Sequence, residues 1–131
     1  MSDKFTVEII SPDRSIIKED TTEVIIPAYE GEMGILKDHI PIISFLKPGI
    51  IKVITGSEEH SFYVEDGIVE FKDNSLSILT SSIFNIKDAD KRFISDSITE
   101  AENELNRDNL DDQKRFLLNH KVEVLKSISI N

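Results

Sequence analysis

The sequence contains no cysteine, which excludes disulfides, thiolate zinc sites and cysteine nucleophiles together. It also contains no apolar run near the ~20 residues that a helix needs to cross a bilayer. Residues 1–4 (MSDK) lack the basic and apolar regions of a signal peptide, and the early acidic residues Asp3 and Glu8 are unlike a transit peptide. The sequence therefore predicts a protein that works on the side of the membrane where it is made, without inserting into it.

Positive charge is scarce. Fifteen basic residues face 25 acidic ones, which gives a net charge of −10. Duplex nucleic acid and anionic lipid head groups would both repel such a surface, so neither is an expected partner. A hydrophobic fraction of 39% in 131 residues is enough for the core of one domain, or of one small domain with an appendage.

Glycine and proline are absent from the last third of the chain. All five glycines and all four prolines precede Ile86, and none follows it. Because both residues punctuate turns between short elements, this asymmetry indicates two regions with different structures. We expect a β-sandwich over residues 1–86 and an α-helical hairpin over residues 87–131.

The first region has the two-residue period of β-strands. Phe5, Val7 and Ile9 alternate with polar residues, as expected for a strand with one buried face. Further strands are predicted at 15–19, at 23–26 (where Pro27 should end the strand), at 50–55 and 61–64 around a turn at 56–59, and at 67–72 and 75–80 around the two-residue turn Asp73-Asn74. Many short strands with closely spaced turns predict an antiparallel sandwich or barrel.

The second region has a helical period. Ile94, Ile98, Ala101 and Leu105 form one apolar stripe, and Asn85 or Asp88 is the expected cap of that helix. Turn formers at 106–109 separate it from a second helix over about 110–127, whose apolar face carries Leu117, Leu118, Val122, Val124, Leu125 and Ile128. Two amphipathic helices with a short connection predict an antiparallel hairpin.

Catalytic and metal-binding patterns are missing. His39 follows Asp38, but no nucleophile accompanies the pair, so packing or an interface is the expected role of the histidine. The acidic pairs Glu58-Glu59 and Glu65-Asp66 fall in predicted turns, where solvation is the default. The sequence has no metal-ligand spacing, and no Gly-Lys-Ser/Thr follows Gly31 and Gly34, which excludes a phosphate loop. We therefore expect no catalysis and no cofactor.

A family resemblance rests on three neighbouring motifs. Residues 25–36 read IIPAYEGEMGIL, residues 37–43 read KDHIPII, and residues 45–49 read FLKPG. This order of an EGE-x-G loop, a His-x-Pro and an LKPG resembles the epsilon subunits of F-type ATP synthases (bacterial and plastid epsilon, mitochondrial delta). Residues 63–71 (YVEDGIVEF) resemble a later strand-turn-strand of that family, with Asp66 where a glycine is common. In the same way, Lys37-Asp38 replaces a frequent Pro-Gly.

The resemblance implies a non-catalytic central-stalk rotor subunit. It would couple the c ring and the gamma subunit to the alpha/beta catalytic head and restrain ATP hydrolysis, as a peripheral protein on the cytoplasmic face of the bacterial inner membrane. The implied contacts are Glu30, Gly31 and Glu32 with c-ring loops, His39 and Pro41 with gamma, and Lys114, Arg115 and Lys121 with the catalytic head.

Two questions stay open at this level. Some bacterial relatives bind ATP through an Ile/Leu-Asp-x-x-Arg-Ala motif, but here Asp88 and Arg92 are four residues apart and Phe93 follows the arginine. On a helix the two could still form a salt bridge, although the motif does not match. The other readings of the whole chain are a free-standing β-sandwich adaptor or ligand-binding module with a dimerising hairpin and, third, a small hydrolase.

Overall fold

The computed structural model describes residues 3–129. The chain divides into two compact units, Met1–Asn85 and Ile86–Asn131. The division falls one residue before the expected boundary.

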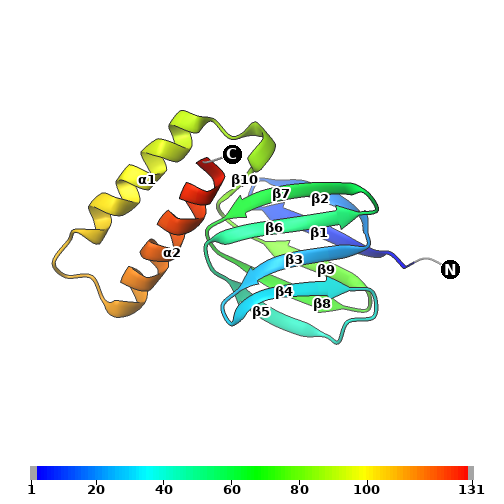
Figure 1. The fold of residues 1–131 in the computed structure, drawn as a ribbon. Coiled ribbons are helices and arrows are strands. Elements are labelled where there is room, and N and C mark those ends of the chain that lie inside the picture. The colour runs from blue at the N-terminus through cyan, green and yellow to red at the C-terminus, as the bar shows by residue number, and fades with distance from the viewer. Residues whose placement is uncertain (1–2, 130–131) are drawn as a thin grey trace. The chain divides into compact units, whose positions relative to one another are not determined.

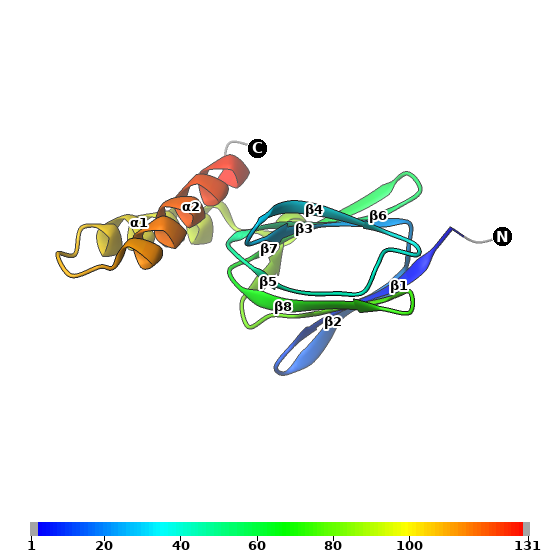
Figure 2. The same cartoon turned by 90° about the horizontal axis from the view of Figure 1, so that it is seen from below.

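The first unit is a β-sandwich (Figure 1, Figure 2). Within residues 3–129 its strands are β1 (Phe5–Ser11), β2 (Arg14–Thr21), β3 (Glu23–Ala28), β4 (Gly31–Leu36), β5 (Ile42–Leu46), β6 (Gly49–Thr55), β7 (Glu58–Val64), β8 (Gly67–Lys72), β9 (Ser75–Leu79) and β10 (Ile83–Asn85). One layer has the order β10-β7-β6-β3-β4 and the other β5-β8-β9-β1-β2. Neighbours are antiparallel except β1 and β9, which are parallel. The predicted sandwich is confirmed.

The sandwich core forms because strand residues alternate between inside and outside. Phe5, Val7 and Ile9 are buried along β1 as predicted. The ring of Phe5 meets Phe71 of β8 edge to face, with centroids 5.6 Å apart. The remaining inward positions are filled by aliphatic and aromatic side chains, chiefly Val24, Ile26, Ile35, Leu46, Ile51, Val53, Phe62, Val64, Val69, Leu76 and Ile78.

Two seams join the layers. Ala28 at the end of β3 pairs with Leu46 at the end of β5. The buried hydroxyl of Thr21, at the end of β2, donates to the carbonyl of Ile54 in β6 at 2.6 Å. Both seams give backbone groups at strand ends a partner inside the protein, as buried polar groups require.

Pro27 does not end β3, contrary to the prediction. The strand continues to Ala28, and Pro27 pairs with Glu32 of β4. Its carbonyl accepts a hydrogen bond from the backbone N–H of Lys47 at 3.1 Å. On the edge of β3 opposite β4, pairing with β6 ends at Ile25 and pairing with β5 occurs only at Ala28. Pro27, which has no backbone N–H, therefore occupies a position without a ladder partner on that edge.

The turn between β8 and β9 was predicted correctly, whereas the turn between β6 and β7 is shorter than predicted. The residues Asp73 and Asn74 form the expected two-residue turn, and both have positive φ (50° and 59°), which these residue types tolerate. The turn expected at 56–59 is shorter: Thr55 pairs with Glu58, so only Gly56 and Ser57 connect the strands. Glu58 and Glu59 belong to β7 and are exposed there.

The second unit begins with the 3₁₀ turn η1 (Ile86–Asp88) and continues as α1 (Lys91–Leu105) and α2 (Asp112–Ser129). The predicted caps of α1 were wrong: Asp90 is the N-cap, and its Oδ1 accepts from the N–H of Arg92 at 2.9 Å. Asp88 cannot serve, because it belongs to η1, and Ala89 and Asp90 lie between it and the first residue of α1. Asp111 caps α2, accepting from the N–H of Lys114 at 2.7 Å.

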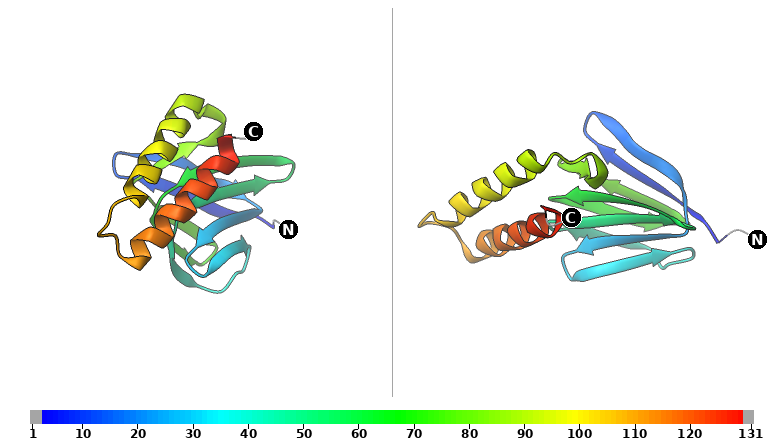
Figure 3. Two further views of the ribbon diagram at one scale, coloured as in Figure 1. Left: turned by 60° about the vertical axis from the view of Figure 1, so that its left-hand side comes forward. Right: turned by 45° about the horizontal axis from the view of Figure 1, so that its top comes forward.

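The two helices run antiparallel as a hairpin (Figure 3). Ala101 of α1 packs with Leu118 and Val122 of α2, and Ile98, Leu105 and Leu110 add to this cluster. The predicted apolar stripes of the two helices are therefore the faces that meet.

Candidate functional site

An apolar row crosses the outer face of one sandwich layer. It consists of Ile10, Phe45, Ile68 and Leu79, on the adjacent strands β1, β5, β8 and β9. Phe45 pairs with Ile68, Ile68 with Leu79, and Leu79 with Ile10, so the four side chains stand side by side. Phe45, Ile68 and Leu79 are 56%, 47% and 52% exposed. Single exposed apolar residues are ordinary, but a contiguous row marks an interaction surface.

An open groove of about 630 Å³ runs over this row, and Pro12 and Tyr29 also line it. At one end the hydroxyl of Ser81 donates to the Asp66 carboxylate at 3.1 Å, and that of Thr80 donates to the Asp66 carbonyl at 2.7 Å. Asp66, which stands where the family commonly has glycine, thus anchors the turn before β8. The next residue, Gly67, is the second glycine of the family's turn. A Cβ at this position would lie 2.7 Å from the carbonyl oxygen of Leu79 and clash with it.

The sequence prediction missed the apolar row. The available signal was residues 42–46, IISFL, which place Ile43 and Phe45 on the face opposite the buried Leu46. A strand that is apolar on both faces needs cover on both. Ile43 is 70% exposed, so within this unit the second face has no such cover.

The acidic loop expected at the c ring is an exposed turn. Tyr29 and Glu30 connect β3 to β4, and Gly31 follows with φ of 136°, a conformation that favours glycine. Glu30 and Glu32 are both exposed. Gly34, which the sequence placed in the turn, lies in β4 opposite Ile25 instead.

In the loop expected at gamma, His39 packs against the core, whereas the next two residues, Ile40 and Pro41, are exposed. The His39 ring packs against Phe71 with centroids 5.9 Å apart, and its Nδ1 lies 2.8 Å from the Ile40 carbonyl. Ile40 is 71% exposed and Pro41 is exposed too. Asp38 has φ of 67°, so this position, where the family often has glycine, keeps a left-handed conformation.

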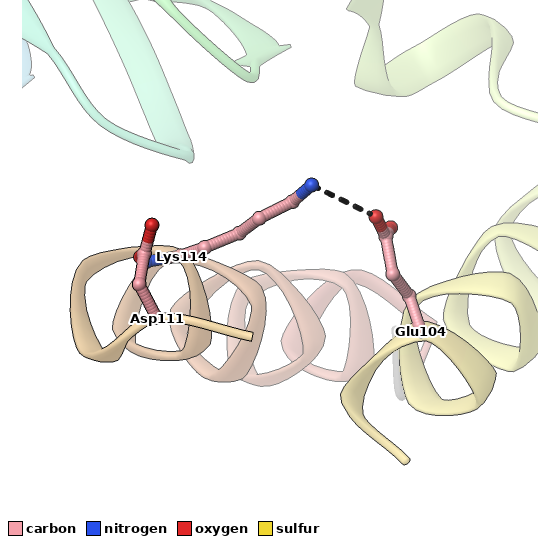
Figure 4. Close-up of polar contacts among 3 residues, drawn as sticks. All are labelled: Glu104, Asp111 and Lys114. Carbon is pink, nitrogen blue, oxygen red and sulfur yellow. Dashed lines mark hydrogen bonds and ion pairs between the residues drawn. The ribbon is translucent and has the colours of Figure 1, made fainter. Parts of the chain in front are cut away.

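Lys114 and Arg115 of α2 have partners inside the hairpin. The Nζ of Lys114 lies 3.5 Å from Oε1 of Glu104 at the end of α1 (Figure 4). The guanidinium of Arg115, which is half-buried, donates to the Leu105 carbonyl at 3.0 Å, a group that the helix end leaves without an intrahelical partner. Lys121 is half-buried further along α2. The three residues are on one helix, but Lys114 and Arg115 join the start of α2 to the end of α1.

Within residues 3–129 no group of three or more His, Asp or Glu side chains is placed to hold a metal ion. Burial raises the pKa of the Tyr63 hydroxyl well above its usual range, and the charge of Glu65 adds to the effect. That phenol therefore stays protonated at neutral pH. No histidine or lysine of the described chain lines the groove, and the Asp66 carboxylate is the group that accepts from the Ser81 hydroxyl there.

Millimolar MgATP is expected to leave the melting temperature of the chain unchanged within about a degree. Asp88 lies in η1 and Arg92 in α1, so the two do not share a helical face, and the expected i, i+4 salt bridge has no helix to support it. If MgATP bound, a nucleotide concentration of a hundred times the dissociation constant would add ~2.7 kcal/mol to the free energy of unfolding. That gain would raise the melting temperature by several degrees. Differential scanning fluorimetry with and without nucleotide measures this. A rise of several degrees that Arg92→Ala removes would contradict the expectation.

The family model and the relatives that match this chain all belong to one family. Residues 4–86 match the family model "ATP synthase, Delta/Epsilon chain, beta-sandwich domain". An ATP synthase epsilon chain of Pelagibacter ubique is 58% identical over 130 residues, covering 98% of this chain and 100% of that one. One from Hyphomonas neptunium is 32% identical over 129 residues, covering 98% and 96%. No helix among residues 3–129 is both long and apolar enough to cross a membrane.

Two solved structures share the fold. A chain of the Euglena gracilis mitochondrial ATP synthase structure (OSCP/F1/c-ring) has a TM-score of 0.77 at 21% identity, covering 99% of this chain and 82% of that one. A chain of the Tetrahymena thermophila mitochondrial structure (central stalk/c-ring) has a TM-score of 0.67 at 15% identity, covering 95% of each. With the family match and the near full-length relatives, the chain belongs to the ATP synthase epsilon chains.

Proposed function

We propose that the chain is a non-catalytic rotor subunit of an F-type ATP synthase. In this role it joins the gamma subunit to the c ring and restrains ATP hydrolysis by the alpha/beta head. Family membership favours this over a free-standing adaptor with a dimerising hairpin. The similar Euglena and Tetrahymena chains come from assemblies that contain a c-ring.

The apolar row carries the proposal, since it supplies a docking surface for gamma. A row of four neighbouring large apolar side chains has the composition of an interface core, which is depleted in charge and enriched in aliphatic and aromatic residues. On β5 the row continues through Ile43 to the exposed Pro41. We therefore assign the gamma contact to the row together with Ile40 and Pro41. His39 supports that loop from beneath through its contact with Phe71.

The c ring and the head are assigned to the other exposed features. Glu30, Gly31 and Glu32 lie where the turn after β3 leads into β4, and both carboxylates reach solvent, which suits polar loops. Lys114, Arg115 and Lys121 are the proposed contacts with an acidic surface of the catalytic head. Such a subunit lies peripherally at the cytoplasmic face of the bacterial inner membrane. It needs no nucleic acid, cofactor or direct insertion into lipid.

Co-purification tests the assignment. The full chain is mixed with an assembly of alpha, beta and gamma subunits, and in parallel with alpha and beta alone, and the mixtures are run on gel filtration. We expect co-elution only where gamma is present. A fragment of residues 1–85 should co-elute as well, because the apolar row and the loop before β5 lie in the first compact unit.

Two controls make the result decisive. Circular dichroism and thermal unfolding establish whether the fragment keeps its strands and unfolds cooperatively, as an independent core predicts. Elution of the full chain apart from the gamma-containing assembly would refute the rotor assignment. Co-elution of the full chain with loss of a folded fragment would show that gamma binding needs the hairpin.

A further inference from the structure

Three residues with unusual backbone conformations meet at one place in the sandwich. Within residues 3–129, the non-glycine residues with positive φ are Asp38, Asp73 and Asn74, at 67°, 50° and 59°. Asp38 lies in the loop before β5, and Asp73 and Asn74 form the turn between β8 and β9. Positive φ is costly for most residues and persists where the surroundings hold it in place.

Asp38 and Asn74 hold each other through reciprocal hydrogen bonds. The backbone N–H of Asp38 donates to Oδ1 of Asn74 at 2.7 Å, and Nδ2 of Asn74 donates to Oδ1 of Asp38 at 3.0 Å. We call this pair the Asp38–Asn74 clasp. It uses both polar atoms of the asparagine amide, so the orientation of that side chain is determined by its partner.

The clasp is fixed to the sandwich on both sides. The carbonyl of Asn74 accepts from the N–H of Thr6 in β1 at 3.1 Å, and the N–H of His39 donates to the carbonyl of Leu36 in β4 at 3.1 Å. The ring of His39 then rests on the core residue Phe71. Beyond these anchors the chain presents Ile40, 71% exposed, and Pro41. Asn74 and Phe71, which lie outside the loop in sequence, thus contact Asp38 and His39, the two residues directly before Ile40.

We propose that Asp38 and Asn74 are positioning residues that hold Ile40 and Pro41 ready to dock. This inference rests on the proposed function, in which that loop contacts gamma. The docking partner is therefore an apolar surface that receives Ile40 and Pro41. An ordered loop binds faster and more tightly than a mobile one, because its conformational freedom is not lost at the moment of association.

The first measurement concerns the order of the loop in the free full chain. The variant Asn74→Gly keeps the positive φ but removes both hydrogen bonds, since glycine adopts this conformation freely. We expect the ¹⁵N order parameter of the Ile40 amide to fall from about 0.85 to below about 0.6. Asp38→Asn keeps an acceptor and tolerates the left-handed conformation, so it should retain the order.

A charge exchange gives the sharper test of the pairing itself. Asn74→Asp removes the amide donor and places two carboxylates against each other, so it should also mobilise the loop. The double variant Asp38→Asn with Asn74→Asp restores one amide and one carboxylate in exchanged places, and it should restore the order. Failure of the double variant to recover, with the fold intact by thermal unfolding, would overturn the clasp.

Binding to the assembly of alpha, beta and gamma then tests the docking role by stopped-flow or surface-based kinetics. We expect Asn74→Gly and Asn74→Asp to lower the association rate constant about fivefold, and the double variant to recover it. Ile40→Asp reports on the proposed function: normal binding by this variant would remove the loop from the gamma interface. If Ile40→Asp weakens binding while Asn74→Gly leaves both the order parameter and the association rate unchanged, Asp38 and Asn74 are not positioning residues.

Discussion

The Ile68→Asp substitution is expected to weaken binding to the gamma-containing assembly by about a hundredfold or more. Ile68 is the central residue of the apolar row, paired with Phe45 on one side and Leu79 on the other. A carboxylate there would be buried without a partner in the complex, which costs several kcal/mol, and each 1.4 kcal/mol is about tenfold in the dissociation constant. Titration of the assembly with fluorescently labelled chain measures the change.

The fold should tolerate the same substitution. Ile68 points outward and is 47% exposed, and exposed strand positions change stability by about 1 kcal/mol or less. Leu36→Asp is the matched control, because Leu36 is 55% exposed on β4 in the other layer and does not belong to the row. Equal affinities for gamma in the wild type and in folded Ile68→Asp would show that the row is not the docking surface.

The sequence predicted the sandwich wherever a local rule decides the structure. The two-residue period of Phe5, Val7 and Ile9 identified the buried face of β1 because successive strand residues point to opposite faces. The Asp73-Asn74 turn followed from the tolerance of both residues for positive φ. The stripes of the two helices met as expected, since residues three and four apart share a helical face.

The errors arose where a distant partner decides the structure. Pro27 remains inside β3 because β3 stops pairing with β6 after Ile25 and pairs with β5 only at Ala28, and no local pattern reveals that gap. The N-cap of α1 is Asp90, although Asn85 and Asp88 also suit a cap by residue type. Asn85 ends β10, where it pairs with the distant Phe62 of β7, and Asp88 lies in η1.

The candidate site was harder to predict than the fold for the same reason. The apolar row brings together Ile10 of β1 and Leu79 of β9, whose parallel pairing joins segments 69 positions apart. Each residue alone looks like an ordinary core residue of its strand. The resemblance predicted the acidic turn and the loop at His39, but the internal partners of Lys114 and Arg115 appear only once both helices are in place.

The triple substitution Lys114→Ala, Arg115→Ala and Lys121→Ala is expected to raise ATP hydrolysis by the assembled enzyme by up to about tenfold. If these cations contact an acidic surface of the head, their loss shifts the balance away from the restraining conformation. Exposed ion pairs contribute ~0–1 kcal/mol each, so one substitution should be nearly silent, whereas three together reach the 1.4 kcal/mol of a tenfold change. Hydrolysis and proton-driven synthesis in membranes with equal subunit content measure the effect, and synthesis should persist.

The hairpin contacts of Lys114 and Arg115 require a control that separates two causes of increased hydrolysis. Glu104→Gln removes the 3.5 Å partner of Lys114 without removing any cation, so it loosens the end of the hairpin and leaves Lys114 available to the head. If the cations act on the head, Glu104→Gln should hydrolyse ATP no faster than wild type while the triple variant does. If both variants gain hydrolysis equally, the packing of α1 against α2 is the restraint. Unchanged hydrolysis in the triple variant would leave these residues with a structural role in the hairpin alone, and loss of synthesis would mean that they hold the stalk together.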